Sequence, residues 1–91
     1  MKELRYTSQF KKDLKRFLNQ PKKLEALNEV LGMLQHEIPL PKKYLQHNLK
    51  GNYTGCLECH IEGDFLLIWY DEESDVIALF RLGTHSELFK Q

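Results

Sequence analysis

The feature that most constrains the fold of this chain is a change in the spacing of its apolar residues. Before Pro39, apolar residues recur three or four positions apart, as they do along one face of a helix. From Gly55 onward they alternate with polar residues, as they do in strands that bury one face. Helices in one half and strands in the other predict an α+β domain, in which a helical hairpin packs on one face of an antiparallel sheet.

Two helices are predicted between residues 8 and 38. Ser8 is a good N-cap for the first helix, and Pro21 suits the first turn of the second. Gly32 weakens the second helix, so we expect a close helix crossing at this position. Pro39 ends that helix. The apolar faces consist of Phe10, Leu14, Phe17 and Leu18 in the first helix and of Leu24, Leu27, Val30, Leu31 and Leu34 in the second.

Four strands are expected, at residues 3–7, 55–61, 65–70 and 76–82, which gives the element order β-α-α-β-β-β. Residues 38–53 show no sustained periodicity, and we expect a basic loop there. Successive strand residues face opposite sides of a sheet. Cys59 should therefore point toward the helices while Glu58 and His60 share the open face, and Arg81 should point away from its two apolar neighbours.

Length and composition indicate one soluble domain. A chain of 91 residues can bury only one core, so residues 1–91 are expected to form a single domain. The apolar fraction of 42% and the charged fraction of 29% are ordinary for a globular protein. No apolar run approaches the roughly 18 residues of a membrane helix, and the charged start does not resemble a signal peptide. We expect a cytoplasmic protein without membrane contact.

Charge is divided along the sequence although the net charge is zero. Residues 1–50 contain eleven Lys or Arg against five acids, whereas residues 51–91 contain two against eight. The halves therefore carry +6 and −6. Such asymmetry indicates a side that binds polyanions, and a solvated lysine face is the ordinary alternative.

The segment Cys56-Leu57-Glu58-Cys59-His60 matches the attachment pattern of c-type haem. Haem attachment of this kind belongs to exported proteins, and strand alternation separates Cys59 from Cys56 and His60. The same separation opposes a zinc site, which needs four converging ligands. We expect reduced cysteines, no metal and no cofactor. A haem or metal module built on these residues is the rival interpretation.

Five residues suited to proton transfer or phosphate binding are predicted at strand ends and in loops, where functional residues are common. Imidazoles transfer protons near neutral pH, and a guanidinium neutralises charge on a phosphate. This chemistry suits phosphodiester cleavage without a metal, with aromatic residues available to stack on unpaired bases. The five residues are His47, His60, Asp64, Arg81 and His85.

Three segments narrow this chemistry to a family. They are His47-x-Leu49-x-Gly51, Glu58-Cys59-His60-Ile61-Glu62-x-Asp64 and Arg81-x-Gly83-Thr84-His85-Ser86-x-Leu88-Phe89. With these segments in order over nearly its whole length, the chain resembles the YafQ branch of the RelE/ParE toxin superfamily. The resemblance implies a RelE-like fold and a type II toxin that cleaves mRNA in the A site of the 70S ribosome and thereby inhibits translation. It also implies a cognate antitoxin as partner.

The resemblance assigns roles to the five residues. His85 looks like the family's general acid, and Arg81 looks like the residue that stabilises charge on the phosphate. His47, His60 and Asp64 would position the 2′-hydroxyl or assist its deprotonation, with their individual roles left open.

Substrate contacts are expected from Lys50, Phe65 and Phe89. Phe65 stands where some relatives of the family have tryptophan, so weaker base stacking is expected there. The alternative function is that of a ParE-like toxin, which binds a protein target such as gyrase and cleaves nothing. A protein that only docks has no need of proton-transfer groups.

Overall fold

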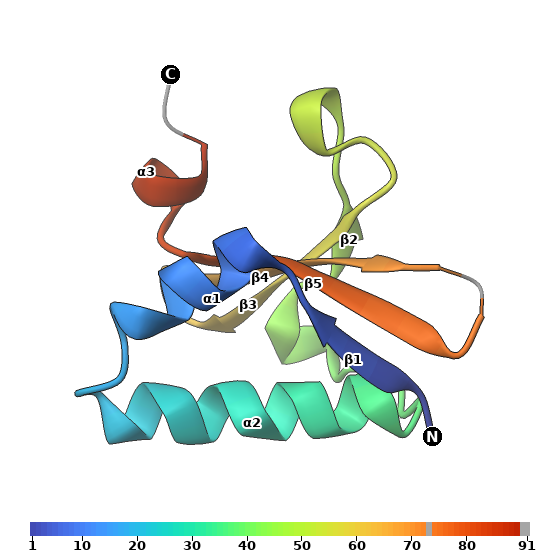
Figure 1. Ribbon diagram of the computed structural model, residues 1–91, viewed down its shortest axis with the longest axis horizontal. Coiled ribbons are helices and arrows are strands. Elements are labelled where there is room, and N and C mark those ends of the chain that lie inside the picture. Colours follow the sequence, from blue (N-terminus) through green and yellow to red (C-terminus); the bar gives the residue numbers. More distant parts are fainter. Residues whose placement is uncertain (73, 90–91) are drawn as a thin grey trace.

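A five-stranded sheet forms the centre of the computed structural model, which describes residues 1–72 and 74–89 (Figure 1). The strands are β1 (Glu3–Tyr6), β2 (His47–Asn48), β3 (Leu57–Glu62), β4 (Phe65–Asp71) and β5 (Val76–Gly83). They lie in the order β1-β5-β4-β3-β2, with β1 parallel to β5 and the other neighbours antiparallel. The α+β class is confirmed, and the β1–β5 pair makes the sheet mixed rather than wholly antiparallel.

Helices lie on both sides of this sheet. The bounds are α1 (Ser8–Lys15), α2 (Pro21–Gln35) and α3 (His85–Leu88), with 3₁₀ turns η1 (Lys42–Tyr44) and η2 (Gly51–Tyr53). In Figure 1, α2 runs along one side of the sheet, and α3 projects from the opposite side together with the loop that contains η2. Within the described ranges, no helix is long and apolar enough to cross a membrane.

Some predicted local details are wrong. The N-cap of α1 is Thr7 and not Ser8, because the Thr7 hydroxyl accepts the Phe10 amide hydrogen. Leu18 lies beyond the end of α1 and is 61% exposed. A Cβ on Gly32 would meet no heavy atom within 4 Å, so no close helix crossing occurs there. The strand β2 lies in the region expected to be a loop, since two residues are too few to show alternation.

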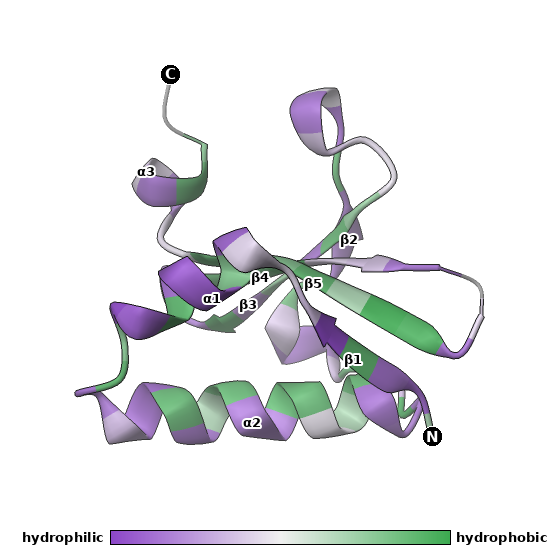
Figure 2. Cartoon of the chain, in the orientation of Figure 1, coloured by the Kyte–Doolittle hydropathy of each residue, from purple (hydrophilic) through white to green (hydrophobic). Residues whose placement is uncertain are grey.

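Apolar side chains form a cluster on each face of the sheet. The larger cluster joins α1 and α2 to the sheet and includes Phe10, Leu27, Val30, Leu67 and Leu79. The smaller one lies on the opposite face and consists of Cys56, Leu66, Ile68 and Leu88, with Leu49, Tyr53 and Phe80 packed against it. Hydrophobic residues colour most of β5 in Figure 2, which agrees with a strand that is covered from both sides.

A β-bulge in β5 changes the direction of Arg81. The pairing of β4 with β5 shifts between Ile68, which pairs with Arg81, and Trp69, which pairs with Leu79. Phe80 is therefore an extra residue, and a bulge of this kind re-aims neighbouring side chains. Phe80 packs on the smaller cluster, and Arg81 hydrogen-bonds Tyr53, which packs on the same cluster. The expectation that Arg81 and Phe80 point to opposite sides is wrong.

Candidate active site

The floor of the candidate site is Glu58, a carboxylate to which the sequence did not assign a role. His47 pairs with Glu58 across β2 and β3, and its Nε2 lies 3.1 Å from Glu58 Oε1. The Nε2 of His60 lies 3.9 Å from the same oxygen. Glu58 is only 2% exposed, and its second oxygen, Oε2, has no hydrogen-bond partner among the described residues. Its alternation with His60 on one strand face was the signal that could have identified it.

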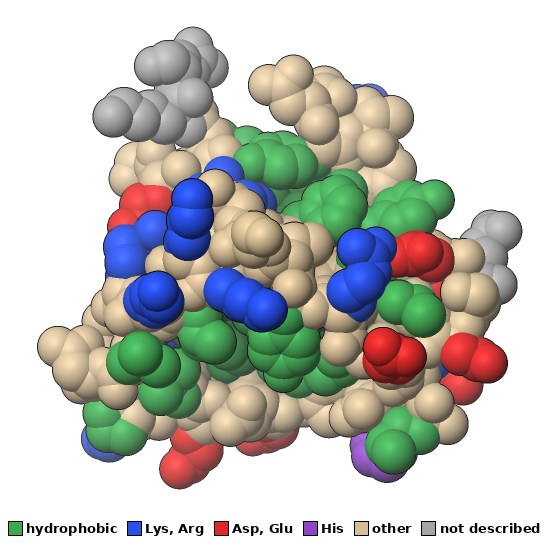
Figure 3. Space-filling model, in the orientation of Figure 1, with side chains coloured by type: hydrophobic (Ala, Val, Ile, Leu, Met, Phe, Trp, Pro, Cys, Tyr) green, Lys and Arg blue, Asp and Glu red, His purple; other side chains and the backbone are tan. Residues whose placement is uncertain are grey.

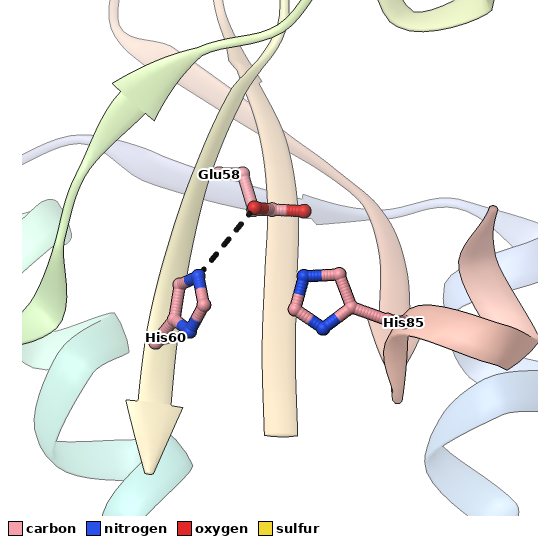
Figure 4. A group of neighbouring side chains, drawn as sticks. All are labelled: Glu58, His60 and His85. Atoms are coloured by element: carbon pink, nitrogen blue, oxygen red, sulfur yellow. Dashed lines mark ion pairs between the residues drawn. The ribbon is translucent and has the colours of Figure 1, made fainter. Parts of the chain in front are cut away.

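Three histidines predicted from the sequence lie in a row next to this carboxylate. The ring centroids of His47 and His60 are 6.3 Å apart, and those of His60 and His85 are 5.5 Å apart. In Figure 4 the rings of His60 and His85 stand on either side of the space below Glu58. The structure thus brings together residues from β2, β3 and α3 that are far apart in the sequence.

Asp64 holds His85 in place. One of its carboxylate oxygens, Oδ1, accepts the backbone amide of His85 at 2.9 Å and the ring Nδ1 at 2.7 Å. These bonds, the backbone one first, hold the pKa of Asp64 below its usual value. Because an ionised carboxylate only accepts hydrogen bonds, Nδ1 of His85 carries the hydrogen. The other ring nitrogen, Nε2, is therefore the one available to contact a substrate.

Local sequence explains why His85 stands at this position. Thr84 caps α3 by accepting the Glu87 amide, and the Glu87 side chain accepts the Thr84 amide in return, which is a capping box. Gly83 precedes the cap, and a Cβ there would lie 2.6 Å from Glu87 Oε1. The sharp end of β5 and the cap together fix the first residue of α3, which is His85.

Arg81 is anchored by a carboxylate that the sequence analysis missed. Asp13 of α1 is fully buried, and its Oδ2 accepts Arg81 Nε at 2.8 Å and the Leu82 amide at 2.9 Å. Asp13 lies three residues after Phe10 and four before Phe17, so it shares their apolar helix face. An acid at that spacing was the available signal.

These contacts shift the pKa values of both partners. Burial alone would raise the pKa of Asp13, but hydrogen bonds from Arg81, from the Leu82 amide and from Gln9 outweigh burial and lower it. The hydrogen bond to Asp13 also raises the pKa of Arg81. Both groups are therefore held in their charged forms.

A cavity of about 610 Å³ adjoins this arginine. Its walls come from the η2 loop, from β5 and from α3 with the residue that follows it, and they consist of Lys50, Asn52, Tyr53, Arg81, Glu87, Leu88 and Phe89. Tyr53 donates to the Leu88 carbonyl at 3.3 Å and accepts Arg81 Nη1 at 3.1 Å. Phe89 is 38% exposed, with its ring centroid 5.7 Å from that of Tyr53 and 6.0 Å from that of His85. The cavity therefore lies next to the row of histidines.

Phe65 does not belong to the site. It is 1% exposed and packs on Phe17 with ring centroids 4.8 Å apart, so it cannot stack on a base. Its side chain lies in the larger cluster, on the helix side of β4. The prediction that Phe65 contacts substrate is wrong, because strand position and not adjacency to Asp64 decides which face it takes.

The two cysteines face opposite sides of the sheet. Cys59 is fully buried in the larger cluster, and burial raises the pKa of its thiol to about 12. Cys56 belongs to the smaller cluster, and burial raises its pKa as well. Cys56, Cys59 and His60 therefore do not converge, and the rival interpretation of a haem or metal module built on them is wrong.

Converging imidazoles that contact carboxylates, together with an anchored guanidinium, define the class of this protein as a small acid–base enzyme on an α+β scaffold. Residues 2–90 match the family described as the bacterial toxin of type II toxin–antitoxin system, YafQ. The chain belongs to this family, as the resemblance of its three sequence segments predicted.

Relatives cover nearly the whole chain. The mRNA interferase toxin YafQ of Escherichia coli (strain K12) is 32% identical over 89 residues, which make up 97% of this chain and 96% of that protein. The toxin fold also matches an E. coli DinJ–YafQ complex with 30% identity, TM-score 0.84 and coverage of 98% and 99% of the two chains. A metal-bound toxin from Helicobacter pylori matches with 39% identity, TM-score 0.87 and coverage of 98% and 100%.

Proposed function

We propose that this protein is a toxin endoribonuclease that cleaves mRNA in the ribosomal A site and so stops translation in the cytoplasm. The observation that carries the proposal is the Asp64–His85 pair, which leaves His85 Nε2 as an oriented group beside an arginine-lined cavity. Such a group can deliver a proton to a leaving oxygen. The E. coli relative that bears the name mRNA interferase supports the choice of RNA as substrate.

The geometry supports a division of roles in cleavage by 2′-hydroxyl attack. Both ring nitrogens of His47 face oxygen acceptors, Leu45 O at 2.8 Å and Glu58 Oε1 at 3.1 Å, so neither is free to take a proton from substrate. We therefore assign proton abstraction to His60 and a positioning role to His47. His85 protonates the 5′-oxygen as it leaves, and Arg81 faces the charge that develops on the phosphate.

The cavity beside Arg81 suits an unpaired nucleobase next to the scissile phosphate. Tyr53 and Phe89 supply aromatic surfaces, and Lys50 supplies a positive charge at its rim. Stacking of bases on aromatic side chains is the usual means by which proteins hold single-stranded RNA. A ribosome that presents the mRNA would reduce the need for a strongly basic surface, which fits a net charge of zero.

The test maps mRNA 5′ ends during translation in vitro with the pure protein. We expect new 5′ ends on translated mRNA and far fewer on naked RNA. His85→Gln should reduce cleavage by about 10²- to 10⁴-fold, the range for loss of a general acid, while a thermal melt stays unchanged.

His36→Gln is the matched control, since His36 lies at the C-cap of α2, away from the site, and should retain full activity. Unchanged 5′ ends with the wild-type protein would contradict the proposal. Inhibition of gyrase under the same conditions would indicate a ParE-like toxin instead.

A cognate antitoxin is the second proposed partner, by analogy with the DinJ–YafQ complex. Co-expression with the protein encoded beside it should relieve growth arrest and yield a stable complex on size-exclusion chromatography. Arrest that persists despite co-expression would contradict this assignment.

A further inference from the structure

We propose that Glu58, His60 and His85 form a binding site for one divalent transition-metal ion, and that an ion bound there inhibits the toxin. The inhibitory part rests on the function proposed above, whereas the binding part does not. Each of the three residues offers one ligand atom, and these atoms lie within 4.8 Å of one another. In Figure 4 the Glu58 carboxylate lies above the gap between the two imidazole rings.

Glu58 is the observation that singles out this group. Its oxygen Oε2 is buried and accepts no hydrogen bond from any described residue, although His47 occupies the neighbouring Oε1. A buried carboxylate oxygen without a partner is unfavourable, and such groups often mark the position of an unseen ion or water. A cation between the two histidines would give this oxygen the partner that the protein does not supply.

The donor set selects the kind of ion. Two imidazole nitrogens with one carboxylate oxygen form a common site for Zn²⁺, in which a water molecule takes the fourth position. Imidazole also suits Cu²⁺, which binds such sites more strongly than Zn²⁺ does. Mg²⁺ and Ca²⁺ prefer oxygen ligands. The site should therefore discriminate in favour of zinc and copper.

The surroundings of the site already orient one ligand. Asp64 accepts the Nδ1 hydrogen of His85 at 2.7 Å, which turns the Nε2 lone pair outward. Carboxylates that hold a metal-binding histidine in this way are typical second-shell partners. The side chains of His60 and His85 are 24% and 54% exposed, so an ion can reach them directly from solvent.

The ligand atoms need a small movement to close around an ion. The Nε2 of His60 lies 3.9 Å from Glu58 Oε1, whereas tetrahedral zinc with ligands at about 2.0–2.2 Å places the ligand atoms roughly 3.5 Å apart. Partly exposed imidazoles can rotate by this amount. The cysteines do not compete, because both are buried and burial raises the pKa of each thiol.

Inhibition follows from the dual use of the same nitrogen atoms. A coordinated imidazole has donated its lone pair, so it can neither accept the 2′-hydroxyl proton nor carry a proton to the leaving oxygen. The ion would also occupy the space between His60 and His85, where the reacting ribose must lie. Occupancy and cleavage should therefore exclude one another.

The binding test uses the full chain, separated from its antitoxin and freed of metal. Titration with CuSO₄ or ZnCl₂ in a calorimeter should give one equivalent. The Cu²⁺ electron paramagnetic resonance spectrum should show coupling to imidazole nitrogen. Glu58→Gln and His60→Ala should each weaken the affinity at least tenfold, and Asp64→Asn should weaken it about 10- to 100-fold, as expected for a second-shell partner.

Matched controls separate this site from others. His36→Gln and the double variant Cys56→Ser/Cys59→Ala should bind the metal as wild type does. Circular dichroism checks that each variant is folded. If Glu58→Gln does not fold, His60→Ala provides the test in its place. Binding that survives both Glu58→Gln and His60→Ala, or that is lost with the cysteines, would overturn the site.

The inhibition test adds one equivalent of Zn²⁺ to the translation cleavage assay. We expect loss of cleavage and full recovery with a chelator, and no effect on a ribosome-only control. Stoichiometric binding with undiminished cleavage would overturn the inhibitory part. If the metal-free protein does not cleave mRNA at all, the proposed function fails while the calorimetric result still decides the site.

Discussion

At the scale of single residues, Arg81 contacts two side chains, one in the buried interior and one at the wall of the cavity. Its Nε and one terminal nitrogen, Nη2, bond the buried Asp13, and its other terminal nitrogen, Nη1, donates to Tyr53 at the cavity wall. A guanidinium has five N–H donors, so some remain for a phosphate. We therefore expect substitution of Arg81 to affect folding as well as the cleavage proposed above.

We predict that Arg81→Ala lowers the free energy of unfolding by roughly 3 kcal/mol, because it leaves the Asp13 carboxylate buried without its main cation. Urea unfolding measures this effect. Arg5→Ala is the matched control: Arg5 pairs with Glu72 at the surface with 55% of its side chain exposed, and its loss should change stability by about 1 kcal/mol or less. Equal effects from the two substitutions would contradict the structural role of Arg81.

A second prediction concerns acid. The pKa of Asp13 in the folded protein lies below its ordinary value of 3.8, so the carboxylate stabilises the fold fully above pH 4. That contribution is lost as the pH falls from about 4 toward the lower folded value. Asp13→Asn should be less stable at pH 7 and should lose less further stability below pH 4. Unfolding curves of both proteins from pH 7 to pH 3 test this, and parallel pH profiles would contradict it.

At the scale of secondary-structure elements, the short helix α3 determines where His85 and Phe89 stand. Its four residues bury only Leu88, so its position depends on the Thr84–Glu87 capping box and on the hydrogen bonds that Asp64 and Tyr53 make to it. Helices this short gain little from their own hydrogen bonds. Changes at the end of β5 should therefore reach the site through the cap.

We predict that Gly83→Ala lowers stability by about 1 kcal/mol, as loss of a cap does, and reduces cleavage to a greater degree. An alanine Cβ would lie 2.6 Å from Glu87 Oε1 and 3.0 Å from Arg16 Nη2, which would displace the cap. Gly32→Ala is the control, because its Cβ meets open space and alanine favours a helix. Retention of full cleavage by Gly83→Ala would show that the cap does not position His85.

The sequence predicted the elements with long and regular patterns. The apolar faces of α1 and α2 and the alternation in β3 fixed the fold class and put His60 on the open face together with Glu58. Features that depend on tertiary contact were not predictable in this way. The bulge at Phe80 puts Phe80 and Arg81 on the same side of the sheet, although successive strand residues normally face opposite sides. The strand β2 is too short to show alternation. Whether an oxygen of Glu58 finds a hydrogen-bond partner depends on residues that are distant in the sequence.

At the scale of the whole molecule, basic side chains gather on one helix. Figure 3 shows Lys and Arg side chains over α1, whereas acidic side chains lie toward the right, along the lower edge and beside the basic group on the left. Lys11, Lys12 and Lys15 are exposed on this helix. They are candidates for contact with ribosomal RNA, whose affinity for a protein falls as salt rises in proportion to the phosphates contacted.

We predict that the triple substitution Lys11→Gln/Lys12→Gln/Lys15→Gln weakens ribosome-dependent cleavage at physiological salt. It should also flatten the dependence of cleavage on salt, by about one unit of slope for each lost phosphate contact. Thermal stability should stay within about 0.5 kcal/mol of wild type, as is usual for surface substitutions. An unchanged salt slope would mean that this lysine face is merely solvated.

The parallel pairing of β1 with β5 has a consequence for synthesis of the protein. Residues 3–6 are synthesised well before residues 76–79, the strand residues with which they pair. This edge of the sheet therefore cannot form until residues 76–79 have left the ribosome, and contacts this distant in sequence form slowly. His85 lies beyond that point in the chain, so a growing toxin chain should remain inert on the ribosome that makes it.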